Sequence, residues 1–377
     1  MMAERAGMAV ILGLTAFLAS LGLSKLARRY ALARALIDVP NERSSHSVPT
    51  PKGGGIAIAV VVLTGLALLA VLGSVGAGPA IALGGGGALV AAVGWLDDHY
   101  GLSAGVRLAV HIAAAVWTVT LLRGMPDLTL GETTTHLGLA GTLLAVTGVV
   151  WATNLYNFMD GIDGLAATEA VVVGAAGWLL LAPHATPLAL VALLVAAAAA
   201  GFLVWNWPPA RLFMGDVGSG FLGFMFGGLA VATENARALP ALLWLVLLGP
   251  FFIDATITLL RRMARGDRWH AAHRTHAYQR AVQSGWSHRR VTSVVAALSG
   301  ALGMAVAAAI ARPGLQVPVL AAAGGILGVL YLALERRRPM PPAGGHEEPG
   351  ANRSTGELAR GRPSYKAGSG EGGRAGR

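Results

Sequence analysis

Apolar runs long enough to cross a lipid bilayer recur along almost the whole chain, and they constrain the fold more than any other feature. A membrane-spanning helix requires about 20 mostly apolar residues. Of the 377 residues, 54% are hydrophobic and only 13% are charged. The sequence therefore predicts an all-α, polytopic integral membrane protein with about eleven transmembrane helices. The predicted spans are 6–24, 54–73, 79–96, 105–122, 138–155, 165–182, 187–205, 219–233, 238–260, 291–311 and 317–334.

Lysine and arginine are divided unequally between the two sets of loops. Segment 25–53 holds six of them and segment 261–290 holds eight, whereas the opposite loops hold four arginines in all. Cytoplasmic loops are enriched in these residues. We therefore predict that the N-terminus is outside and the C-terminus is cytoplasmic, in the plasma (inner) membrane. The net charge of +10 then reflects topology, and no nucleic-acid partner is expected.

The chain divides into a membrane-embedded domain, 1–335, and a tail, 336–377. The tail is rich in Gly, Pro, Arg and Ser and lacks hydrophobic periodicity, so we predict a disordered, basic, cytoplasmic segment. The chain has no cysteine, which excludes disulfides, thiolate catalysis and cysteine-bound metals.

The segment 154–165 reads N-L-Y-N-F-M-D-G-I-D-G-L and lies between two predicted spans. Asn157, Asp160 and Asp163 follow one another at intervals of three, so on a helix they would share one face. Charged residues at the end of a membrane helix are costly and favour a functional role. The alternative is a solvated turn between two helices with no functional role. Such a turn does not require polar residues at regular intervals of three.

Further polar clusters fall in the predicted cytoplasmic loops. Asp97 and Asp98 are adjacent, and Asp216 lies in the sequence M-G-D-V-G-S. Magnesium takes oxygen ligands, often one or two carboxylates together with substrate phosphates. Lys52 precedes the glycine run 53–55, which weakly resembles a phosphate-binding loop. The acids and basic groups together favour a cytoplasmic, phosphate-handling site.

The last cytoplasmic loop, 261–290, contains several histidines. These could form a zinc site, although the many aspartates favour a metal that prefers oxygen ligands. Asp254, inside the ninth predicted span, requires a partner or water and is a further candidate to line the site.

Taken together, these motifs resemble the polyprenyl-phosphate N-acetylhexosamine-1-phosphate transferases of glycosyltransferase family 4. The resemblance covers residues 1–335 in helix layout and includes five motifs in the same order, which makes chance agreement improbable. The motifs are Pro49-Thr-Pro-Lys-Gly-Gly-Gly55, Asp97-Asp98, Asn157-Phe-Met-Asp-Gly-Ile-Asp-Gly-Leu165, Phe213-Met-Gly-Asp-Val-Gly-Ser219, and a last cytoplasmic loop containing histidine.

The resemblance implies transfer of a sugar-1-phosphate from a UDP-sugar to undecaprenyl or another polyprenyl phosphate, with release of UMP. It implies Mg²⁺ as cofactor, with Mn²⁺ as an alternative, and leaves a homodimer open. Asp216 would bind the metal together with Asp98, and Asp97 would act as a base or position the acceptor. The other implied contacts are Asn157, Asp160, Asp163 and Phe213 at the nucleotide, with Phe213 stacked on uracil, and Lys52, His273, Arg274 and His276 at phosphates or sugar.

One stretch departs from the pattern seen in much of the family. Where many members carry a His-x-His-His cluster, this chain reads His273-Arg-Thr-His-Ala-Tyr-Gln-Arg280. Tyr278 and Gln279 replace the second and third histidines, as in the branch that initiates O-antigen synthesis. We therefore expect these two residues to help select the sugar. The departure argues against the muramoyl-pentapeptide substrate of peptidoglycan synthesis, which is kept as an alternative.

Two other classes of protein, a transporter and a structural scaffold, are alternatives to an enzyme. A proton-coupled transporter would show internal repeats and ionisable residues near the bilayer midplane. No repeat of the motif segments is present, and the acids fall at one membrane face. A structural scaffold would not explain the carboxylate clusters.

Overall fold

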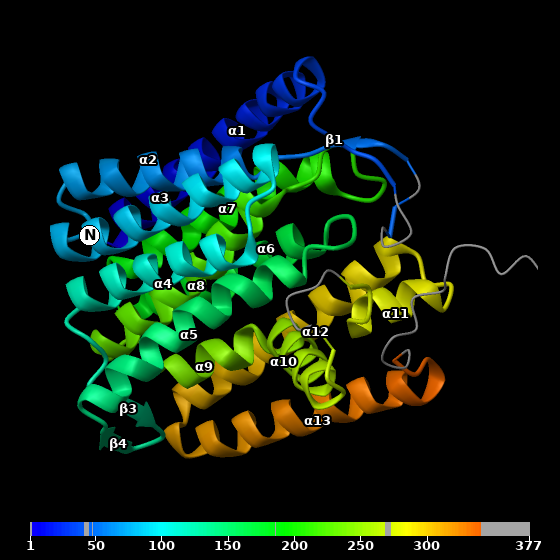
Figure 1. Ribbon diagram of the computed structural model, residues 1–377. Helices are drawn as coiled ribbons and strands as arrows, with labels where there is room; N and C mark the ends of the chain where they lie inside the picture. Colours follow the sequence, from blue (N-terminus) through cyan, green and yellow to red (C-terminus); the bar gives the residue numbers. More distant parts are fainter. Residues whose placement is uncertain (1, 41–44, 47, 185, 268–272, 341–377) are drawn as a thin grey trace, which may run out of the picture. The chain divides into compact units, whose positions relative to one another are not determined.

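The computed structural model describes residues 2–40, 45, 46, 48–184, 186–267 and 273–340, and Figure 1 shows their arrangement. The described part is mainly helical and contains only two short strand pairs, which confirms the all-α class. The long helices are α1 (Met2–Ala33), α2 (Ile56–Val71), α3 (Ala77–Tyr100), α4 (Ala104–Leu121), α5 (Leu139–Phe158), α6 (Leu165–Leu181), α7 (Leu188–Asn206), α8 (Asp216–Asn235), α10 (Gly249–Ala264), α12 (His288–Ala311) and α13 (Gln316–Arg337).

Short elements connect these helices. The helices α9 (Ala241–Leu247) and α11 (Ala277–Gln283) have seven residues each. Strands β1 (Ile37–Asp38) and β2 (Thr50–Pro51) form one antiparallel pair, and β3 (Asp127–Leu130) and β4 (Thr133–His136) form another. The single-turn helices η1 (Ala182–His184) and η2 (Pro313–Leu315) complete the order. In Figure 1 the β3–β4 hairpin lies at the left, and β1 and α11 lie at the right.

All eleven predicted spans correspond to a helix or a helix pair. Within the described residues, nine helices are long and apolar enough to cross a membrane, and α9 with α10 makes a tenth if the bent pair is one span. Helix α2, with 16 residues, is shorter than a typical span. The protein is thus a multi-pass membrane protein; which side each end faces stays a prediction.

The predicted span 238–260 is not one straight helix. It breaks at Leu248 into α9 and α10, which meet at an angle of 86°. Pro250, at the start of α10, explains the break because proline lacks an N–H and clashes with the preceding turn. After the bend, α10 contacts α11.

Helix α8 forms the centre of the membrane domain and packs against α3 and α5. Its aromatic residues Phe221, Phe224 and Phe226 are fully buried. Glycine permits the close approach to α3: a Cβ on Gly94 would lie 2.6 Å from the Asp216 carbonyl oxygen. This packing brings the end of α3, with Asp97 and Asp98, to the start of α8, with Asp216. The predicted disordered tail falls mainly on 341–377, outside the described residues.

Candidate active site

A cavity of about 430 Å³ lies where the predicted motifs meet. The structure brings to it residues that are far apart in the sequence. Eight predicted site residues line it: Lys52, Asp98, Asp160, Asp163, Phe213, Asp216, His273 and Gln279. An apolar groove of about 280 Å³ between α1, α2 and α3 shares Lys52 and Asp98 with this cavity.

Asp97, Asp98, Asp216 and Arg107 form a carboxylate centre at one end of the cavity. Helix α3 ends just after the two acids, at Gly101, whose φ of 66° is readily adopted only by glycine. Asp216 is the first residue of α8, and Arg107 lies in the first turn of α4. Arg107 Nη1 lies 2.7 Å from both Asp97 Oδ2 and Asp216 Oδ2. One guanidinium therefore pairs with two carboxylates, and the three groups keep a net negative charge.

Asp98 has a different environment from its neighbour Asp97. Its Oδ1 accepts from the Asp216 N–H at 3.2 Å, and its Oδ2 accepts from the Val217 N–H at 3.2 Å. These are free amides at the start of α8, where a negative charge is stabilised. Asp98 is only 9% exposed. It therefore fixes the start of α8 and thereby the position of Asp216.

The donor set at the carboxylate centre fits a hard divalent cation. Two carboxylates converge on one positive nitrogen, and Asp98 and Asp160 add oxygens around the same cavity. In the described part of the chain, no group of three or more His, Asp or Glu residues is arranged to hold a metal. A Mg²⁺ here would therefore use one or two carboxylates and complete its shell with water and substrate oxygens, as this ion commonly does.

The turn 159–164 carries Asp160 and Asp163 into the cavity. The expected shared helical face is wrong for these two residues, because α5 ends at Phe158. Gly161 and Gly164 explain the ending: glycine disfavours helix, and Gly164 has a φ of 75°. Asn157 is still on α5 and does not line the cavity. Its side chain donates to Ser219 Oγ at 3.0 Å.

The two aspartates of this turn differ electrostatically. Burial, together with the charges of Asp216, Asp98 and Asp163, raises the pKa of Asp160 well above its usual value. Burial acts in the same direction on Asp163, but His288 and the Ala210 N–H outweigh it and hold the pKa of Asp163 below its usual value. Asp163 Oδ2 accepts from Ala210 N at 3.0 Å, and its Oδ1 lies 3.3 Å from His288 Nδ1.

The loop 49–55 pairs with the segment that carries Phe213. The Phe213 N–H donates to the Pro51 carbonyl at 2.8 Å, and the Gly54 N–H donates to the Phe213 carbonyl at 2.9 Å. Because the Gly55 N–H also donates to Met214, at 2.8 Å, two amides of the glycine run bind protein rather than a phosphate. Lys52 and Phe213 both line the cavity, and the phosphate-binding role of Lys52 stays a prediction.

The last loop splits into residues at the cavity and residues behind it. His273 and Gln279 line the cavity, whereas the Arg274 side chain is exposed. Burial, together with the neighbouring His276 and Arg262, lowers the pKa of His273 to about 3. His276 and Tyr278 are 3% and 4% exposed. Tyr278 donates its hydroxyl to the Phe158 carbonyl at 3.0 Å.

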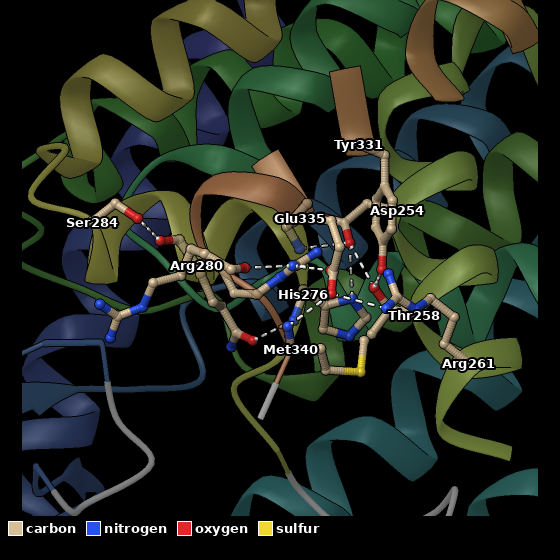
Figure 2. Close-up of polar contacts among 12 residues, drawn as sticks. Asp254, Thr258, Arg261, His276, Arg280, Ser284, Tyr331, Glu335 and Met340 are labelled. Carbon is tan, nitrogen blue, oxygen red and sulfur yellow. Dashed lines mark hydrogen bonds and ion pairs between the residues drawn. The ribbon is translucent and has the colours of Figure 1, made fainter. Parts of the chain in front are cut away.

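Figure 2 shows His276, the residue that precedes α11, near Asp254. His276 Nδ1 lies 3.4 Å from Asp254 Oδ1. Asp254 does not line the cavity, so the expectation that it lines the site is wrong. The catalytic and binding roles assigned to His276 and Tyr278 stay predictions, but a direct contact of either side chain with substrate would require α11 to move.

Comparison with known proteins finds similar sequences. Residues 80–234 match the family described as glycosyl transferase family 4. The chain is also similar to a probable undecaprenyl-phosphate N-acetylglucosaminyl 1-phosphate transferase of Bacillus subtilis, with 28% identity over 300 residues, 78% of this chain and 83% of that protein. Over most of its length the chain is thus similar to polyprenyl-phosphate N-acetylglucosamine-1-phosphate transferases.

Two further family members show how far the similarity extends. A decaprenyl-phosphate N-acetylglucosaminephosphotransferase of Mycolicibacterium smegmatis is 29% identical over 372 residues, 87% of this chain and 89% of its own length. A phospho-N-acetylmuramoyl-pentapeptide-transferase of Thermosynechococcus vestitus is 33% identical over 178 residues, but the match covers only 44% of this chain and 46% of that protein. The two relatives named for N-acetylglucosamine therefore match a larger share of this chain than this muramoyl-pentapeptide relative does.

Three residues at the site were not predicted from the sequence. Arg107 pairs two carboxylates, His288 pairs with Asp163, and Asn206 accepts from the Gly164 N–H at 3.0 Å while lining the cavity. Only Arg107 had a local signal, since it lies one turn into a helix that follows the two acids. His288 and Asn206 reach the site through packing between distant segments.

Proposed function

We propose that this protein transfers an N-acetylhexosamine-1-phosphate from a UDP-sugar to polyprenyl phosphate, releasing UMP. An oxygen of the lipid phosphate would attack the sugar-bearing phosphorus of the donor, and the bond from that phosphorus to the bridging oxygen would break. The products are UMP and a lipid-linked pyrophosphoryl sugar. The observation that carries the proposal is the carboxylate centre, with Lys52 and Phe213, around one cavity.

The residues provide positioning and charge compensation, which dominate phosphoryl transfer. Phe213 would stack on the uracil, and Lys52 would bind phosphate. Arg107 offsets part of the negative charge that would otherwise repel both phosphorylated substrates. The predicted metal ligands are Asp216 and Asp98, but both Asp98 oxygens accept from amides of α8, so we assign the metal to Asp216 and Asp97 instead. Mg²⁺ bound there would supply a Lewis acid for the pyrophosphate oxygens. Asp98 would hold Asp216 in place through the start of α8.

The neighbouring apolar groove supports an acceptor with a polar head and an apolar chain. Its walls come from Leu23, Ile56 and Val60, among others, and its polar end holds Lys52 and Asp98. A lipid phosphate entering there would reach the donor cavity from the membrane side. UDP-N-acetylglucosamine is the first donor to test, because the relatives with the longest matches are named for that sugar.

The test is UMP release by purified protein given polyprenyl phosphate, Mg²⁺ and a panel of UDP-N-acetylhexosamines. We expect release only when acceptor, donor and protein are all present. A lipid product without UMP, or no release with any donor, would refute the transferase. Omission of Mg²⁺, with Mn²⁺ as replacement, tests the cofactor in the same assay.

The proposed orientation places the cavity at the cytoplasmic face of the plasma membrane, where UDP-sugars are made. Because the chain has no cysteine, single cysteines report the topology directly. Ser284, next to α11, and Thr134, in β4, are both exposed. Labelling of Ser284→Cys only from the cytoplasm and of Thr134→Cys only from outside is expected, and the reverse pattern would contradict the orientation. Initiation of O-antigen or another envelope polysaccharide is the role we propose for the product.

A further inference from the structure

Asp254 is a buried acid that the proposed reaction does not use. It lies on α10 and is only 6% exposed. A buried carboxylate is costly unless hydrogen bonds compensate it. Asp254 Oδ1 accepts from the Ala277 N–H at 2.8 Å, and its Oδ2 accepts from the Tyr278 N–H at 3.0 Å. Asp254 thus binds the first turn of α11 from another helix.

Helix α11 depends on such contacts for its position. With seven residues, it is too short to be stable by itself. Its own cap pairs His276 with Gln279: the His276 N–H donates to Gln279 Oε1 at 3.2 Å. That local pair holds the turn together, but only contacts from outside α11 fix where the turn lies.

Glu335, near the end of α13, holds the middle of the same helix. It accepts from Arg280 through a short hydrogen bond, and from Arg261 Nη2 at 2.8 Å. Arg280 is fully buried and also donates to the Arg338 carbonyl at 2.8 Å. Figure 2 shows these side chains as one cluster between α10, α11 and α13. Thr258 connects Asp254 to α13. Its hydroxyl donates to Asp254 Oδ1 at 3.1 Å and lies 3.1 Å from the hydroxyl of Tyr331, which is on α13.

The opposite side of α11 contacts the active site. Gln279 lines the cavity, and Tyr278 binds the Phe158 carbonyl, two residues before Asp160. Gly161 lies directly against α11: a Cβ there would collide with the Tyr278 hydroxyl and lie 3.1 Å from Gln279 Nε2. A shift of α11 would therefore move Gln279 and release the turn that carries Asp160.

We propose that Asp254 and Glu335 are positioning residues that fix α11 against the cavity, and so set the placement of Gln279 and of the Asp160 turn for the donor. This inference rests on the proposed transferase reaction. It assigns no chemistry to either acid: Asp254 acts through two backbone amides and Glu335 through Arg280. The metal-binding carboxylates are held by other helices, so their affinity for Mg²⁺ should not depend on this cluster.

The first test is Asp254→Asn in the full-length protein, compared with Thr258→Val. The amide offers one acceptor oxygen where two backbone N–H groups require two. Misplacement of binding groups costs up to about a hundredfold in rate. We expect kcat/KM for the UDP-sugar to fall on the order of tenfold to a hundredfold, mainly through KM. Thr258→Val removes hydrogen bonds from the same cluster but leaves both amides paired, so we expect kcat/KM within about twofold of wild type.

A second pair of variants covers a failure of Asp254→Asn to fold. Glu335→Gln weakens the hold on Arg280, and Arg337→Gln, in the same turn of α13, is its control. Arg337 is exposed and makes no hydrogen bond or ion pair with any described residue. Glu335→Gln should raise KM for the donor while the Mg²⁺ concentration for half-maximal rate stays unchanged. A purely structural role would lower the melting temperature without changing the KM of the folded protein.

A readout independent of turnover completes the test. In an Ala281→Cys background, where the side chain on α11 is buried, the thiol labelling rate reports the release of α11, and we expect it to rise in Asp254→Asn and Glu335→Gln but not in the two controls. Unchanged labelling and unchanged KM in both acid variants would overturn the positioning role. An absence of UMP release by wild type would instead remove the proposed reaction, while an unchanged labelling rate would still reject the positioning of α11.

Discussion

The carboxylate centre and α11 are both rich in polar residues, yet their surroundings differ. Arg107 and Asp216 at the centre are each about one-third exposed, and a single guanidinium serves both Asp97 and Asp216. On α11, Tyr278 and Arg280 are buried and already bonded to protein groups. A partly solvated charge can exchange its partner for a ligand, whereas a buried, bonded polar group fixes structure. Polar motif residues on one face of the protein thus divide into binding and positioning groups.

The largest effect should come from Asp216. Asp216→Asn keeps the size of the side chain but removes the charge that would bind Mg²⁺ and pair with Arg107. We expect UMP release to fall roughly 10²- to 10³-fold, as when a key electrostatic group is removed, with normal insertion and melting temperature. Asp127→Asn, in the β3–β4 hairpin, is the control and should keep full activity. Near-normal turnover of Asp216→Asn at limiting Mg²⁺ would contradict the metal assignment.

Asp97 and Asp98 test the comparison within a single dipeptide. Both Asn variants should lose most activity, but Asp98→Asn should lose more stability. Asp98 holds two amides of α8, whereas Asp97 holds one amide, that of Leu102, for which an Asn side chain keeps an acceptor oxygen. One amide at the start of α8 would lose its acceptor, and an unpaired buried donor costs about 1–3 kcal/mol. Thermal melts of both variants, alongside UMP release, measure the difference. Equal melting temperatures would mean that Asp98 does not hold α8.

Phe213 should affect every donor alike, because all UDP-sugars share the uracil. Loss of stacking on an aromatic ring costs about 1–3 kcal/mol. Phe213→Ala should therefore raise KM about tenfold to a hundredfold for at least two UDP-N-acetylhexosamines without reordering them. If the variant reorders the donors, the ring contacts the sugar instead.

Gln279 and Tyr278 are adjacent, but we assign Gln279 to the binding groups and Tyr278 to the positioning groups. Gln279 lines the cavity, so Gln279→Ala should change the ranking of donors severalfold, since a lost sugar hydrogen bond affects only donors that make it. Tyr278→Phe should keep the ranking and lower stability by about 1 kcal/mol, because its hydroxyl binds the Phe158 carbonyl. A reordering caused by Tyr278→Phe would place that hydroxyl at the sugar and contradict the division.

The sequence predicted the helices well because apolar runs of about 20 residues have few alternatives in a membrane. It also predicted eight residues that line the cavity, because charged residues at helix ends on one membrane face lie near one another. Five other predicted site residues do not line it: Asp97, Asn157, Arg274, His276 and Tyr278. It failed where backbone detail decides: Pro250 breaks a span, and Gly161 and Gly164 end α5 before the two aspartates. Pairings such as Arg107 with Asp216 depend on how α4 packs beside α8, which local patterns do not contain.

The smallest expected effect concerns His273, and it separates a neutral cavity residue from a phosphate-binding cation. Its pKa of about 3, lowered by burial and by His276 and Arg262, keeps the ring neutral at physiological pH. In the unfolded chain the ring binds a proton below its ordinary pKa of 6.5, whereas the native ring does so only near 3. The unfolded state therefore binds more protons in this window, and stability falls as the pH falls. His273→Gln should make the decrease in melting temperature between pH 6.5 and 4 shallower than in wild type, while the pH dependence of UMP release above pH 6.5 stays the same. A steeper decrease in the variant, or loss of an activity step near neutral pH, would show that His273 is charged in the native protein and belongs with the binding groups.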